Sequence, residues 1–384
     1  MRYYNQAKKN STITVRVMCA IVFCLFCFSW LYWFQADLLT VVQHVLSGGA
    51  THYERTTGAI LITVILQLLQ VAVGTIVRLY RRSHALTYFP SMLLLAILSD
   101  VNADIDHHVL LGSWCWLAPL VLVAWGAAVW LARQIVPFPS DKEPTGMLSR
   151  RSWSNMLIMT IMMLAVAAVS NTNAVFHYRA HAEQALLHND IDEALLTGRR
   201  SEETDASLTM LRAYALSLKG YMAERLFEYP IAGKGSDLLP LSESSSRFLL
   251  LSPDSLFRHL GARPRGEMTA DTYYYLLERD TLATPALADY RLCGMLIDKD
   301  IDRFAHTLGK YYAIDDSLPK HYKEALTLYT HQRSKPVVVY HNPVNDEDWH
   351  DFQELEKQYS LASERRDKVK TRYATSYWYY FFYQ

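Results

Sequence analysis

The stretch "ALTYFPSMLLLAILS", from Ala85 to Ser99, decides how often this chain crosses a membrane. It is apolar enough for a membrane helix, but it is short and contains Pro90. A helix needs roughly 17 to 25 apolar residues to cross the hydrocarbon layer, so the length of this run is marginal. The topology depends on it, because one crossing more or less moves every later segment to the other side of the membrane.

Four other apolar runs surround this stretch. They cover about Val17 to Phe34, Gly58 to Tyr80, Val109 to Phe138 and Asn155 to Val169. Each is long enough, or nearly so, to cross a bilayer. We interpret all five runs as spans of an N-terminal transmembrane domain that comprises residues 1–171.

Basic residues support five crossings, because Lys and Arg in short loops are retained in the cytoplasm during insertion. Five spans leave only Arg55 in the outer loops. The inner segments carry the other basic residues outside the runs: Arg2, Lys8, Lys9, Arg16, Arg78, Arg81, Arg82, Lys142, Arg150 and Arg151. The pattern predicts a bacterial inner-membrane protein with a cytoplasmic N-terminus and a periplasmic C-terminal domain of residues 172–384.

The C-terminal half carries paired helical patterns. "AVFHYRAHAEQALLHNDIDEALL" (174–196) has apolar or small residues at helical spacing, with a polar break before its second short run. "SLTMLRAYALSLKGYMAERLFEYP" (207–230) repeats this arrangement, with Gly220 at the bend. Pro319 follows Pro285 by 34 residues, which is the tetratricopeptide period. The predicted fold is therefore all-α: a five-helix membrane bundle followed by a soluble helical repeat.

The segment "HNDIDEAL" (188–195) resembles the tetratricopeptide-repeat family, with Ala194 at the small position of the second helix. The resemblance extends over about Ala174 to Gln332, although the usual aromatic, Gly and Tyr pattern of the first helix is largely missing. It implies stacked helix pairs that bind proteins. The domain organisation of the whole chain is similar to that of bacterial inner-membrane proteins of unassigned activity, which combine a small helical bundle with a repeat-like C-terminal domain.

Two segments depart from the repeat pattern. Residues from about 231 to 268 contain "GKGSDLLPLSESSSR" and "GARPRGE" and are predicted to form a long loop with one short helix, beginning at Ser252 and Pro253. The tail "YATSYWYYFFYQ", from Tyr373 to Gln384, is too aromatic to face water. We expect it to cover the open end of the helix stack, with docking at the membrane or on a partner protein as alternatives.

The segment "DVNADIDHH" (100–108) combines aspartate and histidine in the predicted second outer loop. In a helical conformation, four of these residues would share one face, and the first outer loop could add two histidines. The candidate metal ligands are Asp100, Asp104, His107, His108, His44 and His52. Carboxylate and imidazole together suit zinc, manganese or iron, so a divalent metal is the cofactor this loop could hold.

The same residues also fit a plain structural role, which we favour. Asp104 and Asp106 would lie in the first turn of the fourth membrane helix, where the helix dipole favours negative charge. No strict ligand motif such as HExxH is present. The alternative is an enzyme, with Asp104, Asp106 and His107 as candidate catalytic residues.

The enzyme alternative rests on a resemblance to polytopic membrane glycosyltransferases. Some of these carry acidic residues in an outer loop that act on a lipid-linked sugar, and some have tetratricopeptide tails. The "DID" of residues 104–106 carries the resemblance here. The chain departs from that superfamily in having too few spans and in placing its acidic loop after the third span.

Other functional classes find little support. The 38 basic residues balance the 38 acidic ones and form no stripe with interleaved aromatics, which argues against a nucleic-acid partner. No GxSxG or Gly-rich phosphate loop is present. The span centres lack charged residues, which argues against a transporter, and Gln67 and Gln70 are predicted to form hydrogen bonds between helices.

The sequence therefore predicts a scaffold or adaptor without a cofactor. The lipid bilayer would surround its N-terminal half. An envelope protein would bind its repeat domain and its aromatic C-terminus.

Overall fold

Helices are the only regular elements among the residues that the computed structural model describes, namely 2–77, 79, 81–101, 112–134 and 150–384. This confirms the all-α prediction. The chain divides into two units, unit 1 of Met1–Asn173 and unit 2 of Ala174–Gln384. Each unit is described by itself below.

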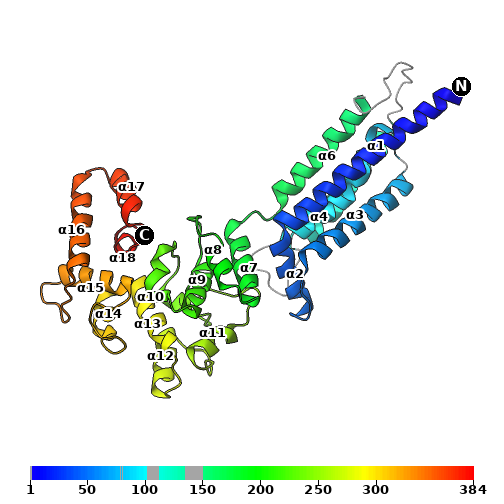
Figure 1. Ribbon diagram of the computed structural model, residues 1–384. Coiled ribbons are helices and arrows are strands. Elements are labelled where there is room, and N and C mark those ends of the chain that lie inside the picture. Colours follow the sequence, from blue (N-terminus) through cyan, green and yellow to red (C-terminus); the bar gives the residue numbers. More distant parts are fainter. Residues whose placement is uncertain (1, 78, 80, 102–111, 135–149) are drawn as a thin grey trace. The chain divides into compact units, whose positions relative to one another are not determined.

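Unit 1 is a bundle of helices that lie side by side (Figure 1). Its elements are α1 (Arg2–Ser29), the π-helical turn η1 (Trp30–Phe34), α2 (Ala36–Ser47), α3 (Arg55–Val77), the 3-10 segment η2 (Arg81–Tyr88), α4 (Phe89–Ser99), α5 (Trp114–Gln134) and α6 (Arg150–Val169). Among the residues described for this unit, four stretches are long and apolar enough to cross a membrane: Ile13–Phe34, Arg55–Val77, Trp114–Gln134 and Ser152–Val169. This is consistent with the predicted membrane protein.

The prediction of a fifth helix of membrane-spanning length at Ala85–Ser99 is wrong. The described apolar helix there, Ser83–Ser99, is shorter than the four candidate spans, and its α-helical part begins at Phe89. Pro90 lies in the first turn of α4, where its missing N–H is tolerated, whereas farther inside a helix it would break a hydrogen bond. The 11 residues of α4 rise only about 16 Å, roughly half the thickness of the hydrocarbon layer.

Although α4 is short, it lies within the bundle, packed against α3 and α6. At its entry, the Ala85 N–H donates to Asn155 Oδ1 (2.8 Å) near the beginning of α6. At its exit, Trp30 Nε1 donates to Ser99 Oγ (3.1 Å), and the Asn171 N–H donates to the Ser99 carbonyl oxygen (2.8 Å) beyond the end of α6. The segment from Ala85 to Ser99 therefore runs from one end of the bundle to the other.

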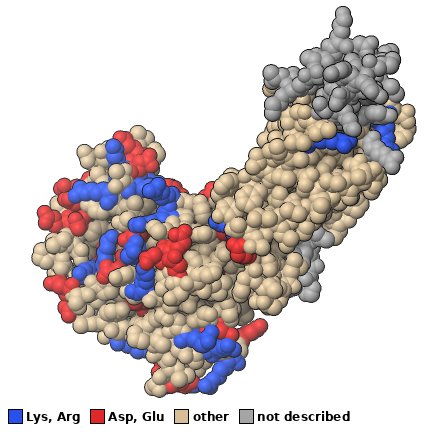
Figure 2. Space-filling model, turned by 45° about the vertical axis from the view of Figure 1, so that its right-hand side comes forward, with Lys and Arg blue, Asp and Glu red and all other residues tan. Residues whose placement is uncertain are grey.

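Unit 2 contains fourteen helical elements, all within the described range 174–384. They are α7 (Ala174–Leu187), α8 (Ile191–Leu196), α9 (Ala206–Leu218), α10 (Met222–Arg225), η3 (Leu226–Glu228), η4 (Gly235–Leu238), α11 (Pro253–Leu260), α12 (Ala270–Arg279), α13 (Pro285–Ile297), α14 (Ile301–Leu308), α15 (Lys320–Gln332), α16 (Pro343–Gln358), α17 (Ala362–Tyr373) and α18 (Tyr377–Tyr383). One continuous hydrophobic core extends from α8 to α18. Figure 2 shows both signs of charge interspersed on its surface.

Four turns of unit 2 share one backbone geometry, in which a residue with positive φ follows a helix. These residues are Asn189 (φ 60°), Gly220 (φ 72°), Thr281 (φ 57°) and Lys299 (φ 59°). In each turn, the N–H of the next residue donates to the carbonyl oxygen five residues before it, at 2.9 Å. This is the Schellman arrangement, which satisfies the last carbonyl groups of a helix and reverses the chain. The turns join α7 to α8, α9 to α10, α12 to α13 and α13 to α14.

Thr281 is poorly suited to its turn, because a β-branched side chain disfavours positive φ. We expect Thr281→Gly to raise the free energy of unfolding of unit 2 by about 1 kcal/mol. Amide hydrogen exchange of the full-length protein in detergent would measure the change. Gly220→Ala is the matched control: its Cβ would meet nothing within 4 Å, so it should lower stability through the backbone alone. A stability loss in Thr281→Gly would contradict this explanation.

The segment 231–268 contributes to the core of unit 2. It contains η4 and α11, and Leu238, Leu239 and Leu256 belong to the continuous core. The predicted helix start is confirmed, since α11 begins at Pro253 and Ser252 Oγ accepts a hydrogen bond from the Asp254 N–H. Some of its turns form hydrogen bonds to buried polar groups, among them Glu183 of α7.

The aromatic tail is packed inside unit 2, as predicted. In α18, the side chains of Tyr377, Trp378, Tyr379 and Tyr380 are all at most 7% exposed. They pack against α15 and α17 and join the core. Phe382 remains 42% exposed.

Candidate functional site

Most of the predicted Asp/His loop lies outside the described residues. This applies to Asp104, Asp106, His107 and His108, and the predictions about them remain predictions. Asp100 is described: it caps the end of α4, and its Oδ2 accepts a hydrogen bond from Trp114 Nε1 (2.7 Å). This carboxylate thus holds the two ends of the loop together.

The histidines of the first outer loop have backbone roles. The His44 carbonyl oxygen accepts from the Gly49 N–H (2.9 Å) at the end of α2, and the His52 carbonyl oxygen accepts from Gln43 Nε2 (3.3 Å). Over the described ranges, no group of three or more His, Cys, Asp or Glu side chains could hold a metal ion. His44, His52 and Asp100 therefore do not form a metal site with one another.

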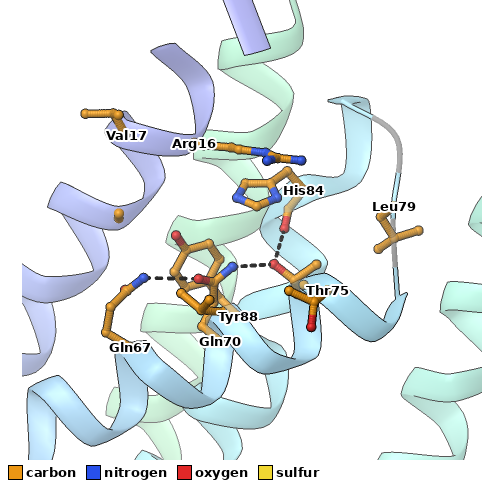
Figure 3. A pocket seen from close by; sticks show the side chains of 12 residues that line it. Arg16, Val17, Gln67, Gln70, Thr75, Leu79, His84 and Tyr88 are labelled. Carbon is orange, nitrogen blue, oxygen red and sulfur yellow. Dashed lines mark hydrogen bonds between the residues drawn. The ribbon is translucent and has the colours of Figure 1, made fainter. Parts of the chain in front are cut away.

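A polar pocket in the described part of unit 1 lies at the opposite end of the bundle, between α1, α3 and η2 (Figure 3). Its volume is about 700 Å³. Three polar side chains form a hydrogen-bonded chain in it. Gln67 Nε2 donates to Gln70 Oε1 (3.0 Å), and Gln70 Nε2 donates to Thr87 Oγ1 (2.8 Å).

Each glutamine also makes a hydrogen bond to a separate helical element, which confirms the prediction for the two glutamines. Gln70 of α3 bonds Thr87 of η2, and Cys24 Sγ of α1 donates to Gln67 Oε1 (3.7 Å). In apolar surroundings, an amide without a hydrogen-bond partner is costly, so this series of hydrogen bonds stabilises the bundle. Thr87 Oγ1 also donates to the His84 carbonyl oxygen (2.8 Å) and thereby fixes the turn that carries His84.

Arg16 and His84 occupy the mouth of this pocket. The Arg16 guanidinium extends over the His84 ring (Figure 3), and the ring of Tyr88 lies edge-on to His84 with centroids 5.7 Å apart. Arg16 is exposed. Neither the Arg16 guanidinium nor the His84 ring has a hydrogen-bond or ion-pair partner among the described residues. Two nitrogen-rich side chains are thus free to bind a ligand.

The pocket is suited to binding an anion. None of its described lining residues is an aspartate or a glutamate. Its donors are a guanidinium and an imidazole, beside apolar walls that include Val17 and Val71. Sequence reasoning used Arg16 only as a topology marker. A cation and a histidine at the same predicted end of two neighbouring runs were the signal that could have identified the site.

Comparison with known proteins reaches only the C-terminal part of the chain. Residues 267–384, from just before α12 to the end of α18, match a family of unknown function (DUF6057). This match covers less than a third of the 384 residues. No curated protein and no solved structure matches the chain.

Proposed function

We propose that this chain is a membrane-anchored helical scaffold of a bacterial envelope. Unit 1 would hold it in the inner membrane, and unit 2 would bind a protein partner. The observation that carries the proposal is the set of four equivalent turns in unit 2. Repeated helix pairs expose extended surfaces that bind other proteins and need no chemistry of their own.

The contacts between helices favour a repeat-like stack. Helix α7 packs on both α8 and α9, and α9 packs on α10. In the next part, α13 packs on α14, and α14 packs on α15. Such nearest-neighbour packing is typical of tetratricopeptide-like solenoids, although α10 has only 4 residues and the insertion separates α10 from α12.

The direction of α4 supports a periplasmic position for unit 2. Ala85 bonds the beginning of α6, and Ser99 bonds Asn171 just beyond its end. The Ala85–Ser99 segment therefore runs in the same direction as α6. Helices α3 and α5 run in the opposite direction. Arg16, Arg133 and Arg150 lie at the end opposite to Asn171. Since basic residues are retained in the cytoplasm, the chain would leave unit 1 on the outer face. A local thinning of the bilayer would accommodate the short α4.

A membrane-impermeant, amine-reactive cross-linker applied to spheroplasts tests both parts of this proposal. We expect the exposed Lys335, Lys357 and Lys368 of unit 2 to react, and Lys8 and Lys9 to react only after lysis. Mass spectrometry should also recover cross-links from these unit 2 lysines to one recurrent partner protein. Labelling of Lys8 and Lys9 in intact spheroplasts would contradict the topology.

A matched variant separates the scaffold from the glycosyltransferase alternative. The combined change Asp104→Asn, His107→Gln and His108→Gln should leave the cross-linked partner unchanged. Stoichiometric metal in the purified parent protein, lost from this variant, would support the enzyme instead.

A further inference from the structure

We propose that the pocket between α1, α3 and η2 binds the phosphate group of an anionic membrane lipid. Arg16 would be the main ligand, and His84 the second donor. This inference goes beyond the scaffold function and does not depend on unit 2.

The charge of the described residues at this end of the bundle favours an anion. Helices α1, α5 and α6 bring Arg16, Arg133 and Arg150 there, and none of the described residues at this end is acidic. Figure 2 shows basic side chains gathered at this end, whereas most of the remaining visible bundle surface is uncharged. Arg133 is already engaged, since its Nε donates to the Val77 carbonyl oxygen (3.1 Å). Arg16 is the cation that lines the pocket.

The depth of Arg16 favours a headgroup. It directly precedes the apolar run that begins at Val17. His84 has the corresponding position, directly before the apolar run that begins at Ala85. Both donors thus lie near the level of lipid phosphates, where an arginine extends its charge toward the interface.

The walls of the pocket favour a lipid over a free phosphate ion. Val17 is 49% exposed and Val71 is 51% exposed, and both line the pocket on helices whose outer surfaces are apolar. A phosphate held by Arg16 would leave its acyl chains beside these valines, where they bury apolar surface. Basic pockets between membrane helices on the cytoplasmic side bind anionic headgroups in this manner.

The interior of the pocket keeps the donors in position. Gln67, Gln70 and Thr87 satisfy one another, and the last of them bonds the His84 carbonyl oxygen. The backbone that carries His84 is therefore fixed before a ligand arrives. A preorganised site loses less conformational entropy on binding.

Native mass spectrometry of the full-length protein in detergent tests the proposal, with phosphatidylglycerol, phosphatidylcholine and inorganic phosphate as separate probes. We expect phosphatidylglycerol to be retained in preference to the other two. Arg16→Gln should weaken this binding by about tenfold or more, because a charge-assisted hydrogen bond is lost. His84→Gln should have a smaller effect in the same direction.

Arg150→Gln is the matched control, since it removes an exposed charge from the same end without touching the pocket. We expect it to retain phosphatidylglycerol like the parent protein. If Arg16→Gln does not fold, Arg16→Lys, which keeps the charge but loses the bidentate donors, should still bind measurably more weakly than Arg150→Gln. Equal loss in the Arg16 and Arg150 variants would overturn the proposal. So would equal retention of phosphatidylcholine, or binding of inorganic phosphate without lipid.

Discussion

Trp378→Ala is expected to lower the free energy of unfolding of unit 2 by about 3–5 kcal/mol, the usual cost of removing a large buried aromatic side chain. Trp378 is 2% exposed. Its ring lies 5.2 Å from that of Trp349 and 5.9 Å from that of Phe352, between centroids, and its Nε1 donates to the Glu324 carbonyl oxygen (2.7 Å). The substitution would leave a cavity where α15, α16 and α18 meet.

The loss should extend beyond α18, because the tail stabilises distant parts of the core. Tyr377 Oη donates to the Leu296 carbonyl oxygen (3.2 Å) and Tyr380 Oη to the Ile297 carbonyl oxygen (2.7 Å), both at the end of α13. We therefore expect faster amide exchange in α13 as well as in α15 and α16. Truncation of the chain after Thr375 should have a still larger effect.

Phe382→Ala is the control for this prediction, because Phe382 lies four residues farther along the same helix but is 42% exposed. It should lower the free energy of unfolding by less than half as much as Trp378→Ala. Urea denaturation of the full-length protein, combined with amide exchange, measures both variants. Equal and small losses in the two variants would show that the tail is dispensable for the fold.

Glu183→Ala is expected to lower the stability of unit 2 by about 3 kcal/mol or more. Glu183 of α7 is fully buried. Its carboxylate accepts hydrogen bonds from the backbone N–H groups of Leu249, Leu250 and Leu251, at 2.6 to 2.9 Å. Alanine would leave the buried Leu250 N–H and two partly buried N–H groups without an acceptor, at a cost of about 1–3 kcal/mol for a buried donor before relaxation.

The effect of Glu183 should depend on pH. Burial raises its pKa from the ordinary 4.5 to about 7, against the opposing effects of the three N–H donors and of Arg179. Between these two values the folded chain binds more protons than the unfolded chain, so stability falls as pH rises. The raised pKa corresponds to roughly 3 kcal/mol, most of it lost between about pH 4.5 and pH 7.

Glu183→Gln should remove this pH dependence, because the amide does not titrate. It keeps one acceptor oxygen, so its loss of stability should be smaller than that of alanine. Glu203→Ala, at an exposed position nearby in the chain, is the control and should change stability by less than about 0.5 kcal/mol. Urea denaturation at pH 5 and pH 7 distinguishes these cases. If the free energy of unfolding of Glu183→Gln still changed between pH 5 and pH 7 as in the parent protein, Glu183 would not be the cause of the pH dependence.

Local sequence patterns predicted the individual helices well. Apolar runs indicated the four helices that are long and apolar enough to cross a membrane, and "HNDIDEAL" indicated a helix pair with its turn at Asn189. Such features arise from side-chain periodicity and capping within a few residues, so a single segment contains the information. The same reasoning overestimated the length of the α-helix between Ala85 and Ser99, because composition does not reveal where an α-helix begins.

Three features were decided only by tertiary structure. Glu183 bonds residues 66 to 68 positions away, Arg16 meets His84 on another helix, and the tail bonds the end of α13. Each contact joins residues whose distance depends on how all the intervening helices pack.

The sequence by itself determined that the chain is helical, which segments suit a membrane, and that the aromatic tail must be buried, because hydrophobicity and periodicity act locally along a chain. Only the tertiary structure decided which polar groups meet inside the two units. Burial makes an unpaired polar group costly, and the packed helices determine which partner is within reach.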